Sequence, residues 1–388
     1  MKKADRLNKL EMSKIRMTSK KMDAIEASGQ KIIRFTYGEP NFNTPDYIKE
    51  AAKKAIDENH TKYTDYTGSP AFQAAVAAKY ERENGLKFKP SQVISTHGGA
   101  QAAYLVLTTF LNPGDEVIIP NPMYNIYRII GEICGATVKE YKLKEENGFQ
   151  IDLKEMESLI TDKTKMIVIC SPSNPIGSVL TDENLEGLGE LVKDKDLIIC
   201  SDEMYERLTY DGVQASSPAK FDTMRDKTII INGFSKAFAM TGWRIGYVIT
   251  PEEWFEPLYL HTGHQVSGMA DFIIEACTVA LNDEPKYGTI EKMRAEFDER
   301  RKFLVKEINS MKHFSCLNPV GAFYIFMNIR KTGMTSAEFC SYAIDKYRLA
   351  LIPGDAFGTN GEGYARLSYA SSMEVLEKAI GILQEMDR

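Results

Sequence analysis

Six short runs rich in isoleucine and valine constrain the fold of this chain more than any other feature. They are QVIST (92–96), DEVIIP (115–120), KMIVIC (165–170), DLIIC (196–200), KTIII (227–231) and GYVIT (246–250), and stretches with apolar residues at helical spacing separate them. Short continuous apolar runs are typical of parallel strands that are buried on both faces and joined by crossover helices. The chain therefore predicts an α/β fold whose large domain has a mostly parallel central sheet.

The last third of the chain predicts a second domain. Between Pro285 and Met311, apolar residues recur at steps of three, four or seven, which predicts one long amphipathic helix. The runs GAFYIFMNI, LALIPG and YARLSYA then indicate strands of a smaller α+β domain. We expect an N-terminal arm with part of the small domain over residues 1–45, a large domain over 46–285, and a linker helix with the small domain over 286–388.

A helix is expected to begin at Thr44 and Pro45, because threonine caps helix N-termini and proline is favoured in the first turn. A second helix is expected between the segments HGGA and NPGD. The apolar spacing of the first helix predicts a buried face, which consists of Ile48, Ala52, Ala55 and Ile56.

The charges of the chain argue against two classes of partner. Lysine and arginine total 48 against 54 aspartates and glutamates, a net charge of −6, and both signs are scattered rather than grouped. Such a surface is not expected to bind nucleic acid or an anionic membrane. The first residues lack the uninterrupted apolar core of a signal peptide, and no later apolar run is long enough to cross a bilayer. We therefore expect a cytoplasmic protein.

The cysteines and histidines indicate neither disulfides nor a metal site. The six cysteines are far apart without a CxxC pair, and the five histidines show no metal-ligand spacing with them. Cys170 and Cys200 each end an apolar run, which favours small buried side chains in a reducing compartment.

Polar residues that directly follow the predicted strands are the candidates for chemistry, because ligands of open α/β sheets bind at the carboxyl ends of the strands. The backbone N–H groups of Gly98 to Gln101 could approach a phosphate at a helix N-terminus, although an ordinary tight turn explains these residues equally well. Asp202 would be a partly buried carboxylate that needs a cation, or else a helix N-cap. Asn174, inside SPSNPIG, is also a common turn residue.

Lys236 connects these groups. Most lysines are solvated surface charges, but this one follows a predicted strand and lies among the apolar residues from Phe234 to Met240. A desolvated lysine loses its proton readily and becomes a nucleophile toward carbonyls. A phosphate-bearing aldehyde cofactor bound to Lys236 as a Schiff base accounts for the lysine, the small loop and the carboxylate together, and Arg244 adds a cation for the phosphate.

At this point the sequence resembles a known family. SKAFAMTGWRIGY is similar to the signature of pyridoxal-phosphate-dependent aminotransferases of class I/II, which have fold type I, and the chain resembles their bacterial aspartate-aminotransferase-like subgroup. Eight further segments follow the family's order over nearly the whole chain: GEPNFNTP, TKYTDYTGSPAFQAAVA, GGAQAAY, NPGDEVIIPNPMY, SPSNPIGSVL, SDEMYERLTYDG, GAFYIF and ARLSYA. The resemblance implies a large domain that binds pyridoxal 5'-phosphate and a smaller α+β domain.

The resemblance also implies roles for individual residues. Lys236 matches the Schiff-base lysine, and Asp202 matches the partner of the pyridine nitrogen. Asn174 and Tyr205 match the pair that binds the phenolic oxygen of the cofactor, and Tyr124 matches the aromatic residue that stacks on its ring. The residues that match the phosphate site are Gly99, Ala100, Gln101, Ser235, Arg244 and, from the neighbouring subunit, Tyr63.

For the substrate, Arg366 matches the arginine that binds the α-carboxylate, and Gly38 matches a residue of the loop that closes over the site. Asn174 and Tyr37 are expected beside them. Further candidates for the pocket walls are Thr36, Tyr127, His264 and Tyr324.

The implied activity is transfer of the amino group of an L-amino acid to a 2-oxo acid, with ping-pong kinetics, by a homodimer that shares its active sites. Two positions depart from the family: Gly233 stands where many relatives have a phosphate-binding serine, and Ala100 stands where some dicarboxylate-specific relatives have a lysine. The donor is therefore aspartate or an aromatic or neutral amino acid. A C–S β-lyase of the same fold is an alternative. A non-catalytic regulatory domain that binds the cofactor is a third reading, but the chain ahead of GEP has no basic recognition helix.

Overall fold

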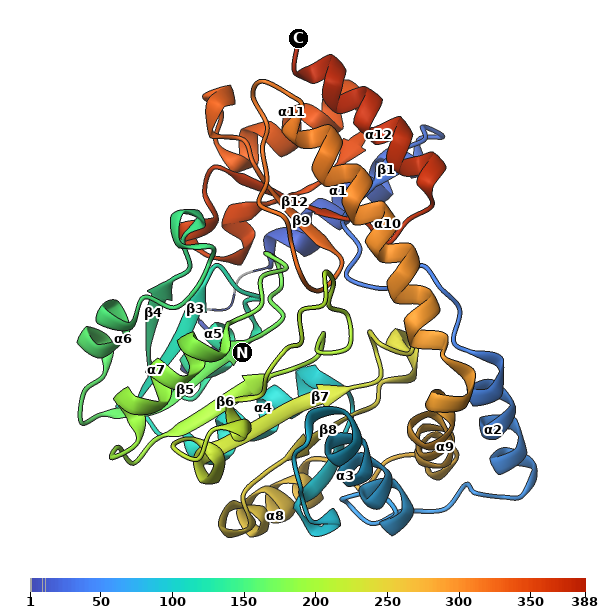
Figure 1. Ribbon diagram of the computed structural model, residues 1–388, viewed down its shortest axis with the longest axis vertical. Helices are drawn as coiled ribbons and strands as arrows, with labels where there is room; N and C mark the ends of the chain where they lie inside the picture. Colours follow the sequence, from blue (N-terminus) through green and yellow to red (C-terminus); the bar gives the residue numbers. More distant parts are fainter. Residues whose placement is uncertain (1, 9, 11) are drawn as a thin grey trace.

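A seven-stranded sheet forms the centre of the protein in a computed structural model that describes residues 2–8, 10 and 12–388 (Figure 1). Its strands follow the order β2-β8-β7-β6-β5-β3-β4. They are β2 (Val93–Thr96), β3 (Glu116–Asn121), β4 (Thr137–Lys142), β5 (Thr164–Cys170), β6 (Ile198–Asp202), β7 (Thr228–Gly233) and β8 (Gly246–Ile249). All six predicted runs are strands of this sheet, and the predicted α/β class with a mostly parallel sheet is confirmed.

Two strands differ from the sequence expectation. β8 is antiparallel to both of its neighbours, β2 and β7, because only a short connection with a single helical turn at Thr241–Trp243 separates it from β7. β4 was not expected at all. It is an edge strand with partly exposed residues, so it lacks the continuous apolar run that marks the buried strands.

Helices cover both faces of the sheet, and alternate strand residues face opposite layers. Val168 of β5 belongs to the same apolar cluster as α4 (Gly99–Phe110), α5 (Ile126–Ile133) and α8 (Phe255–Gln265). Ile167 and Ile169 of β5 pack instead with α6 (Leu153–Leu159) and α7 (Asp182–Val192). Toward β7 and β8, this second face is covered by α2 (Asp46–Asp57), α3 (Pro70–Asn84) and α9 (Asp271–Tyr287).

A smaller layered unit contains the three-stranded sheet β11-β12-β9, in which β12 (Tyr364–Ser368) pairs antiparallel with β9 (Tyr324–Asn328) and β11 (Ile352–Pro353). Its helices are α11 (Ser336–Tyr347) and α12 (Met373–Met386), and the N-terminal helix α1 (Lys14–Ala27) packs on the same unit. The chain segment β1 (Ile33–Arg34) pairs in parallel with β10 (Leu349–Ala350). The N-terminal segment and the C-terminal part of the chain are thus joined in space.

The predicted long helix is α10 (Thr289–Asn309), which runs from the helices of the large sheet to the smaller unit (Figure 1). It begins after Gly288, which has a φ of 60° and separates α10 from α9, so Pro285 belongs to α9. The helix α2 begins at Asp46 with Pro45 as N-cap. The capping role expected of Thr44 is wrong, because its hydroxyl donates to the carbonyl of Ala239 at 2.8 Å.

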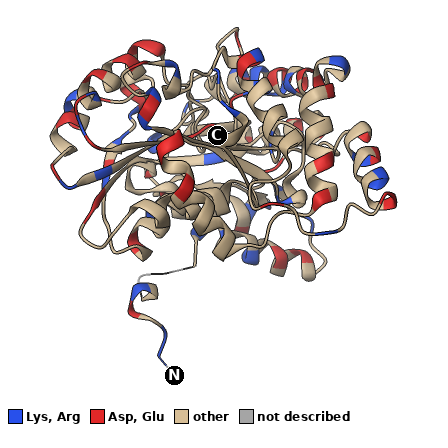
Figure 2. Ribbon diagram, turned by 90° about the horizontal axis from the view of Figure 1, so that it is seen from below, with Lys and Arg blue, Asp and Glu red and all other residues tan. Residues whose placement is uncertain are grey.

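Ile48, Ala52 and Ala55 of α2 are buried as predicted, whereas Ile56 is 47% exposed. Acidic and basic residues are interspersed along the outer helices (Figure 2). Within the described part of the chain, no helix combines the length and the apolar composition that a membrane span needs.

The packing of α10 yields a stability prediction. Phe297 of α10 is fully buried, and its ring lies 5.3 Å from the ring centroids of both Phe42 and Phe323. Phe297→Ala is expected to lower the free energy of unfolding by about 3–5 kcal/mol, because it removes apolar contacts and leaves a cavity. Urea denaturation measures this change. The control is Glu299→Ala on the exposed side of the same helix, which is expected to stay within about 0.5 kcal/mol of the wild type; equal effects of the two substitutions would contradict the prediction.

Candidate active site

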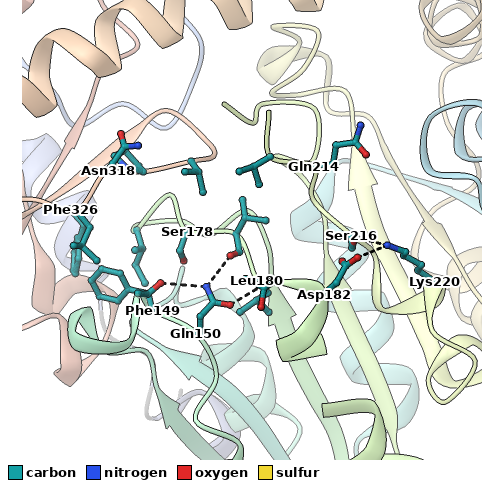
Figure 3. A pocket seen from close by; sticks show the side chains of 18 residues that line it. Phe149, Gln150, Ser178, Leu180, Asp182, Gln214, Ser216, Lys220, Asn318 and Phe326 are labelled. Carbon is teal, nitrogen blue, oxygen red and sulfur yellow. Dashed lines mark hydrogen bonds and ion pairs between the residues drawn. The ribbon is translucent and has the colours of Figure 1, made fainter. Parts of the chain in front are cut away.

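A cavity of about 310 Å³ lies at the carboxyl ends of the central strands, where β9 and β12 of the smaller unit face them. Its walls are formed by Ile15, Thr36, Gly38, Gly99, Ala100, Tyr124, Ile126, Tyr127, Cys170, Asn174, Asp202, Met204, Tyr205, Ser235, Lys236, Arg244, Tyr324 and Arg366. A larger pocket of about 560 Å³ lies elsewhere, between loops that include Phe149, Leu180 and Asn318 (Figure 3), and it contains none of the predicted site residues.

Asp202 is the last residue of β6, and its side chain lies on the cavity side of the sheet. One carboxylate oxygen accepts a hydrogen bond from the Tyr127 hydroxyl at 2.8 Å, and the other accepts one from the Met204 backbone N–H at 3.2 Å. Burial raises the pKa of the Asp202 carboxyl, and the two hydrogen bonds act in the opposite direction. The chain after Asp202 forms turns rather than a helix, so the N-cap alternative is wrong.

Lys236 lies three residues beyond the end of β7. Its ammonium group donates a hydrogen bond to the backbone carbonyl of Gly38. Burial lowers the pKa of Lys236 to about 8, with further lowering from Arg366 and Arg244, while Glu39 and Asp202 raise it. The neutral, nucleophilic form of this amine is therefore far more populated near neutral pH than in an exposed lysine, although the charged form still predominates.

One end of the cavity has the character of an anion site. α4 begins there, and its N-cap Gly98 has a φ of 79°. A Cβ atom at Gly98 would approach Nη2 of Arg244 to 2.7 Å, so only glycine allows the guanidinium to lie this close to the backbone. Among the described residues, Arg244 donates to the backbone carbonyls of Thr241 at 2.8 Å and His97 at 3.4 Å and forms no ion pair with a carboxylate, and Ser235 lines the same cavity. Backbone N–H groups, a hydroxyl and an unpaired cation together suit a phosphate.

The other end of the cavity contains Arg366 of β12, whose side chain is 2% exposed. It donates from Nη1 to the Asn174 side-chain oxygen at 3.1 Å and from Nη2 to the Thr36 carbonyl at 2.8 Å. Its Nε has no hydrogen-bond partner within the described residues, and the guanidinium lies 4.5 Å from the centre of the Tyr324 ring. Burial lowers the pKa of Arg366. A buried guanidinium without a carboxylate is costly, which indicates that a ligand supplies the anion.

The structure brings most of the predicted residues together. The cavity walls contain Lys236, Asp202, Asn174, Tyr205, Tyr124, Gly99, Ala100, Ser235, Arg244, Arg366 and Gly38, and of the further candidates Thr36, Tyr127 and Tyr324. The Tyr205 and Tyr324 hydroxyls lie 2.7 Å apart and share a hydrogen bond.

Four predicted residues lie outside the cavity walls of this chain. Gln101 donates a hydrogen bond to the side chain of Gln265 at 2.7 Å instead of facing the cavity, because α4 turns it toward α8. Tyr37 is 45% exposed, Tyr63 is 90% exposed, and His264 is also absent from the walls. The family resemblance assigns Tyr63 to the site of a neighbouring subunit. A side chain this exposed is available for such a contact.

Sequence reasoning missed the wall residues Ile15, Ile126, Cys170 and Met204, and it did not foresee the contact between Tyr127 and Asp202. The sequence contains an indication for Tyr127. It lies in the first turn of α5, three residues after Tyr124, so the two side chains are expected to be close together. Ile15 has no local signal, since it comes from the distant helix α1.

Gly233, one of the departures from the family, has a structural explanation. A Cβ atom at this position would come within 2.9 Å of the Cα atom of Gly246 on β8. The close approach of β7 and β8 therefore excludes a serine here without a shift of the backbone.

One group of potential metal ligands lies apart from the cavity. His60, Asp271 and Glu275 meet at the start of α9, where the His60 ring lies 3.2 Å from the Asp271 carboxylate. Sequence spacing did not reveal this group, since His60 is far from α9 along the chain. Nothing else in the structure points to a bound ion there, and we assign it no metal.

Comparisons with known proteins agree with this geometry. The family described as aminotransferase class I and II matches residues 30–383. The chain belongs to this family.

Among relatives of the aminotransferase, the aspartate aminotransferase of Pyrococcus abyssi is 40% identical over 99% of this chain and 98% of its own length. The aromatic-amino-acid aminotransferase 2 of Thermococcus litoralis is 39% identical over 99% of this chain and 97% of its own length. The structure of Thermus thermophilus aspartate aminotransferase with maleate superimposes with a TM-score of 0.94 and 32% identity, and covers 99% of each chain. The protein is thus a fold-type I transaminase that uses pyridoxal phosphate, and these relatives do not favour the C–S β-lyase alternative.

The cavity residues fit this cofactor. Lys236 offers an amine with a lowered pKa, and the anion site of Gly99, Ser235 and Arg244 offers donors for the phosphate. Asp202 offers a carboxylate at the end of β6 for the pyridine nitrogen. The separate guanidinium of Arg366 is left for the substrate.

The lowered pKa of Lys236 predicts a pH-dependent stability of the cofactor-free protein. Folding moves this pKa from 10.5 to about 8, so at pH 7 the folded state carries the penalty of a buried charge. Lys236→Met is therefore expected to raise the free energy of unfolding by up to about 3 kcal/mol at pH 7. As the pH rises from about 8 to 10.5, the unfolded wild type binds more protons than the folded one, so wild-type stability rises and the difference shrinks.

Urea denaturation at several pH values measures this difference. The control is Lys62→Met, since Lys62 is exposed and its replacement is expected to change neither the stability nor its pH dependence appreciably. A wild type and a Lys236→Met variant whose unfolding free energies change with pH in parallel would show that Lys236 is not desolvated in solution.

Proposed function

We propose that this aminotransferase moves the amino group of an L-amino acid to a 2-oxo acid, and that Arg366 binds the α-carboxylate of both. One observation carries the proposal: among the described residues, a guanidinium that is 2% exposed has no carboxylate partner and keeps an unbonded Nε, in the same cavity as Lys236. A carboxylate can accept two parallel hydrogen bonds from a guanidinium and also neutralises its charge. Asn174, which accepts from Nη1, orients the guanidinium.

When bound through its aldehyde to an amine, pyridoxal phosphate supplies an electron sink that weakens the bond between Cα and its hydrogen. We propose that Lys236 holds the cofactor and afterwards acts as the general base that moves the Cα proton, for which a pKa of about 8 is suited. Asp202 binds the pyridine nitrogen, and Tyr127 keeps its carboxylate oriented. Tyr205 and Asn174 bind the phenolic oxygen, and Tyr124 covers the ring.

The phosphate is proposed to bind at the start of α4 and at the loop after β7. The proposed residues are Gly99, Ala100, Gln101, Ser235 and Arg244, with Tyr63 from a second subunit. Gln101 has the least support among these residues, because its side chain donates to Gln265 and its backbone N–H donates to the Gly98 carbonyl at 3.1 Å. Gly38 and Tyr37 belong to the segment that covers the substrate, and the hydrogen bond from Lys236 to the Gly38 carbonyl supports this placement.

For the amino donor, we propose a neutral or aromatic side chain rather than aspartate. The cations in the walls are Lys236, Arg244 and Arg366, and the roles above occupy all three. Ile15, Ile126 and Ala100 present apolar surface to the same space. An apolar side chain is stabilised by burial against them, whereas a second carboxylate would be desolvated without a partner.

The assembly, domain division and location also belong to this proposal. A homodimer with shared sites is supported by Tyr63, whose 90% exposure leaves its ring free to enter a second copy. We propose that the chain is divided into an arm with part of the small domain (1–45), a large domain (46–285), and a linker helix with the rest of the small domain (286–388). Six free cysteines, of which Cys134 alone is not fully buried, fit a cytoplasmic protein.

Two substitutions test the residue roles. Lys236→Ala is expected to abolish transamination and the absorption of the lysine-bound cofactor, because no other amine in the cavity can replace it. Arg366→Gln is expected to lower kcat/KM by about a hundredfold or more, mainly through KM, since it removes a charge-assisted contact to the carboxylate. Steady-state kinetics and borohydride trapping measure both effects. The assignments fail if Lys236→Ala still transaminates at a comparable rate, or if Arg366→Gln binds amino acids normally.

A donor panel tests the proposed side-chain preference. Phenylalanine, tyrosine, leucine, alanine and aspartate are supplied with 2-oxoglutarate or pyruvate as acceptor, and the spectral change of the cofactor is recorded. We expect higher kcat/KM for a neutral or aromatic donor than for aspartate. A preference for aspartate would show that a cation from outside these walls enters the pocket.

A further inference from the structure

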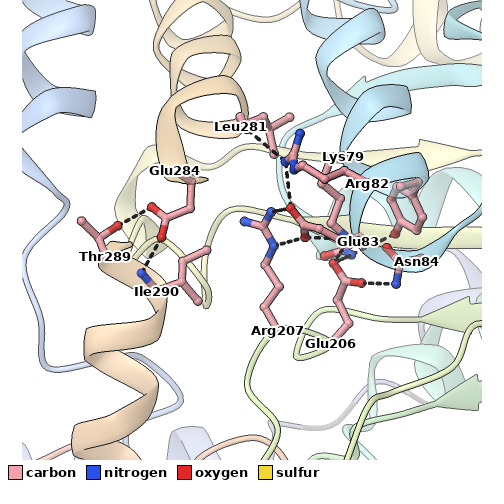
Figure 4. Close-up of polar contacts among 12 residues, drawn as sticks. Lys79, Arg82, Glu83, Asn84, Glu206, Arg207, Leu281, Glu284, Thr289 and Ile290 are labelled. Carbon is pink, nitrogen blue, oxygen red and sulfur yellow. Dashed lines mark hydrogen bonds and ion pairs between the residues drawn. The ribbon is translucent and has the colours of Figure 1, made fainter. Parts of the chain in front are cut away.

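A second group of buried charges lies on the face of the sheet opposite the active site. Lys79, Tyr80, Glu83 and Asn84 of α3 meet Glu203, Glu206 and Arg207, which follow β6, and Asn232 of β7. We call these eight residues the α3 network. Figure 4 shows Lys79, Glu83, Asn84, Glu206 and Arg207 of this network. Nothing in the proposed reaction uses them, although ions are rarely buried without a reason.

The α3 network and the active site share one loop, residues 202–207. Strand alternation sends Asp202 into the cavity and Glu203 to the other face, where Glu203 accepts hydrogen bonds from Ser201 at 2.9 Å and Tyr80 at 3.2 Å. Met204 and Tyr205 return to the cavity walls. Glu206 and Arg207 then belong to the α3 network again, so the loop is anchored on both sides of Tyr205.

Lys79 is central among these contacts. Its side chain is 1% exposed, and its ammonium group donates to the Glu206 carboxylate and, at 3.0 Å, to the side-chain oxygen of Asn84. Glu206 also accepts hydrogen bonds from Asn84 at 3.1 Å and from Asn232 at 3.1 Å. The Lys79–Glu206 pair thus joins α3 to the end of β7 as well as to the loop after β6.

One further contact connects the α3 network with the segment of Lys236, and another connects the loop 202–207 with α4. The Arg207 guanidinium lies 5.2 Å from the centre of the Phe238 ring, two residues after Lys236. The Met204 methyl group lies 2.7 Å from where a Cβ of Gly99 would be, at the first residue of α4. A displacement of the loop would therefore disturb the anion site as well as Asp202 and Tyr205.

The charges of the α3 network balance in one protonation state. Lys79 and Arg207 are the cations, and Glu83 and Glu206 are their carboxylates. Burial and the charge of Glu206 raise the pKa of Glu203 to about 7, so that this fifth group is mostly neutral below that pH. The remaining polar groups that face Glu203 are the hydroxyls of Ser201, Ser217 and Tyr80. The removal of Lys79 would leave the buried Glu206 carboxylate without the cation to which it is hydrogen-bonded.

We propose that Lys79 is a positioning residue of the transamination reaction: through Glu206 it holds the loop 202–207 and the end of β7, and so places Asp202 and Tyr205 relative to Lys236. The proposal rests on the roles given to these three residues above. Errors of about 1 Å in such placement lower enzymatic rates strongly. A purely stabilising role for the ion pair is the competing explanation.

Two variants of the holoenzyme separate these explanations. Lys79→Met leaves an unpaired buried carboxylate, so we expect a lower urea midpoint together with a kcat reduced at least about tenfold. The double variant Lys79→Met/Glu206→Met replaces both charges by apolar side chains of similar size, which restores much of the stability but not the tether. We expect the kcat of the double variant to remain at least about tenfold below that of the wild type. We also expect the midpoint of the pH titration of the lysine-bound cofactor absorption to differ from the wild type by about half a unit or more.

The control is Lys87→Met, since Lys87 is 83% exposed at its side chain and lies just beyond α3; it is expected to match the wild type in all three measurements. If the double variant regains kcat and the spectral midpoint along with its urea midpoint, the ion pair only stabilises the fold and the proposal is wrong. An unchanged kcat and spectral midpoint in Lys79→Met overturns it as well. If Lys79→Met alone does not fold, the kcat and the spectral midpoint of the double variant distinguish the two explanations. Borohydride trapping at Lys236 in the wild type separately tests the underlying assignment.

Discussion

Burial of charge at the carboxyl end of the central sheet is the constraint on which the rest of the structure depends. Asp202, Lys236 and Arg366 must be removed from water to have the properties that the reaction needs, and each loses hydration in the process. The fold compensates locally: Tyr127 and Met204 donate to Asp202, Gly38 accepts from Lys236, and Asn174 and Thr36 accept from Arg366. Arg366 remains without a carboxylate among the described residues, and in the proposed function the substrate would supply this anion.

The two structural units are needed together for this arrangement. β12 and β9 contribute Arg366 and Tyr324, whereas the central sheet contributes Lys236 and Asp202. Gly177, at a φ of 77°, links the units, because its carbonyl accepts hydrogen bonds from Val320 at 3.0 Å and Gly321 at 2.8 Å. Asn174 lies three residues before Gly177, and its side-chain oxygen accepts a hydrogen bond from Arg366. The same loop therefore contacts the smaller unit and lines the candidate active site.

Much of the candidate site was predictable because its residues follow buried strands. Asp202 and Lys236 stand within five residues of the ends of apolar runs, and parallel strands bring their carboxyl ends to one edge. Tyr127, Ile15 and Met204 were not predictable in the same way, since their relation to the site depends on how helices and loops pack. The α3 network could not be predicted from the sequence at all. Lys79 appears as one more charge on an amphipathic helix until the sheet is placed against it.

The amino-acid sequence by itself determined the α/β class, most strands of the large sheet, and the candidate lysine and aspartate at the centre of the site. These follow from local patterns, because apolar runs and the residues after them are contiguous in the chain. Arg366 was indicated only by the family resemblance. Tertiary structure alone decided the antiparallel direction of β8, the exposure of Tyr63, the hydrogen bond from Tyr127 to Asp202 and the burial of Lys79. The physical reason is that pKa shifts and ion pairing depend on desolvation by residues distant in sequence, which no local pattern specifies.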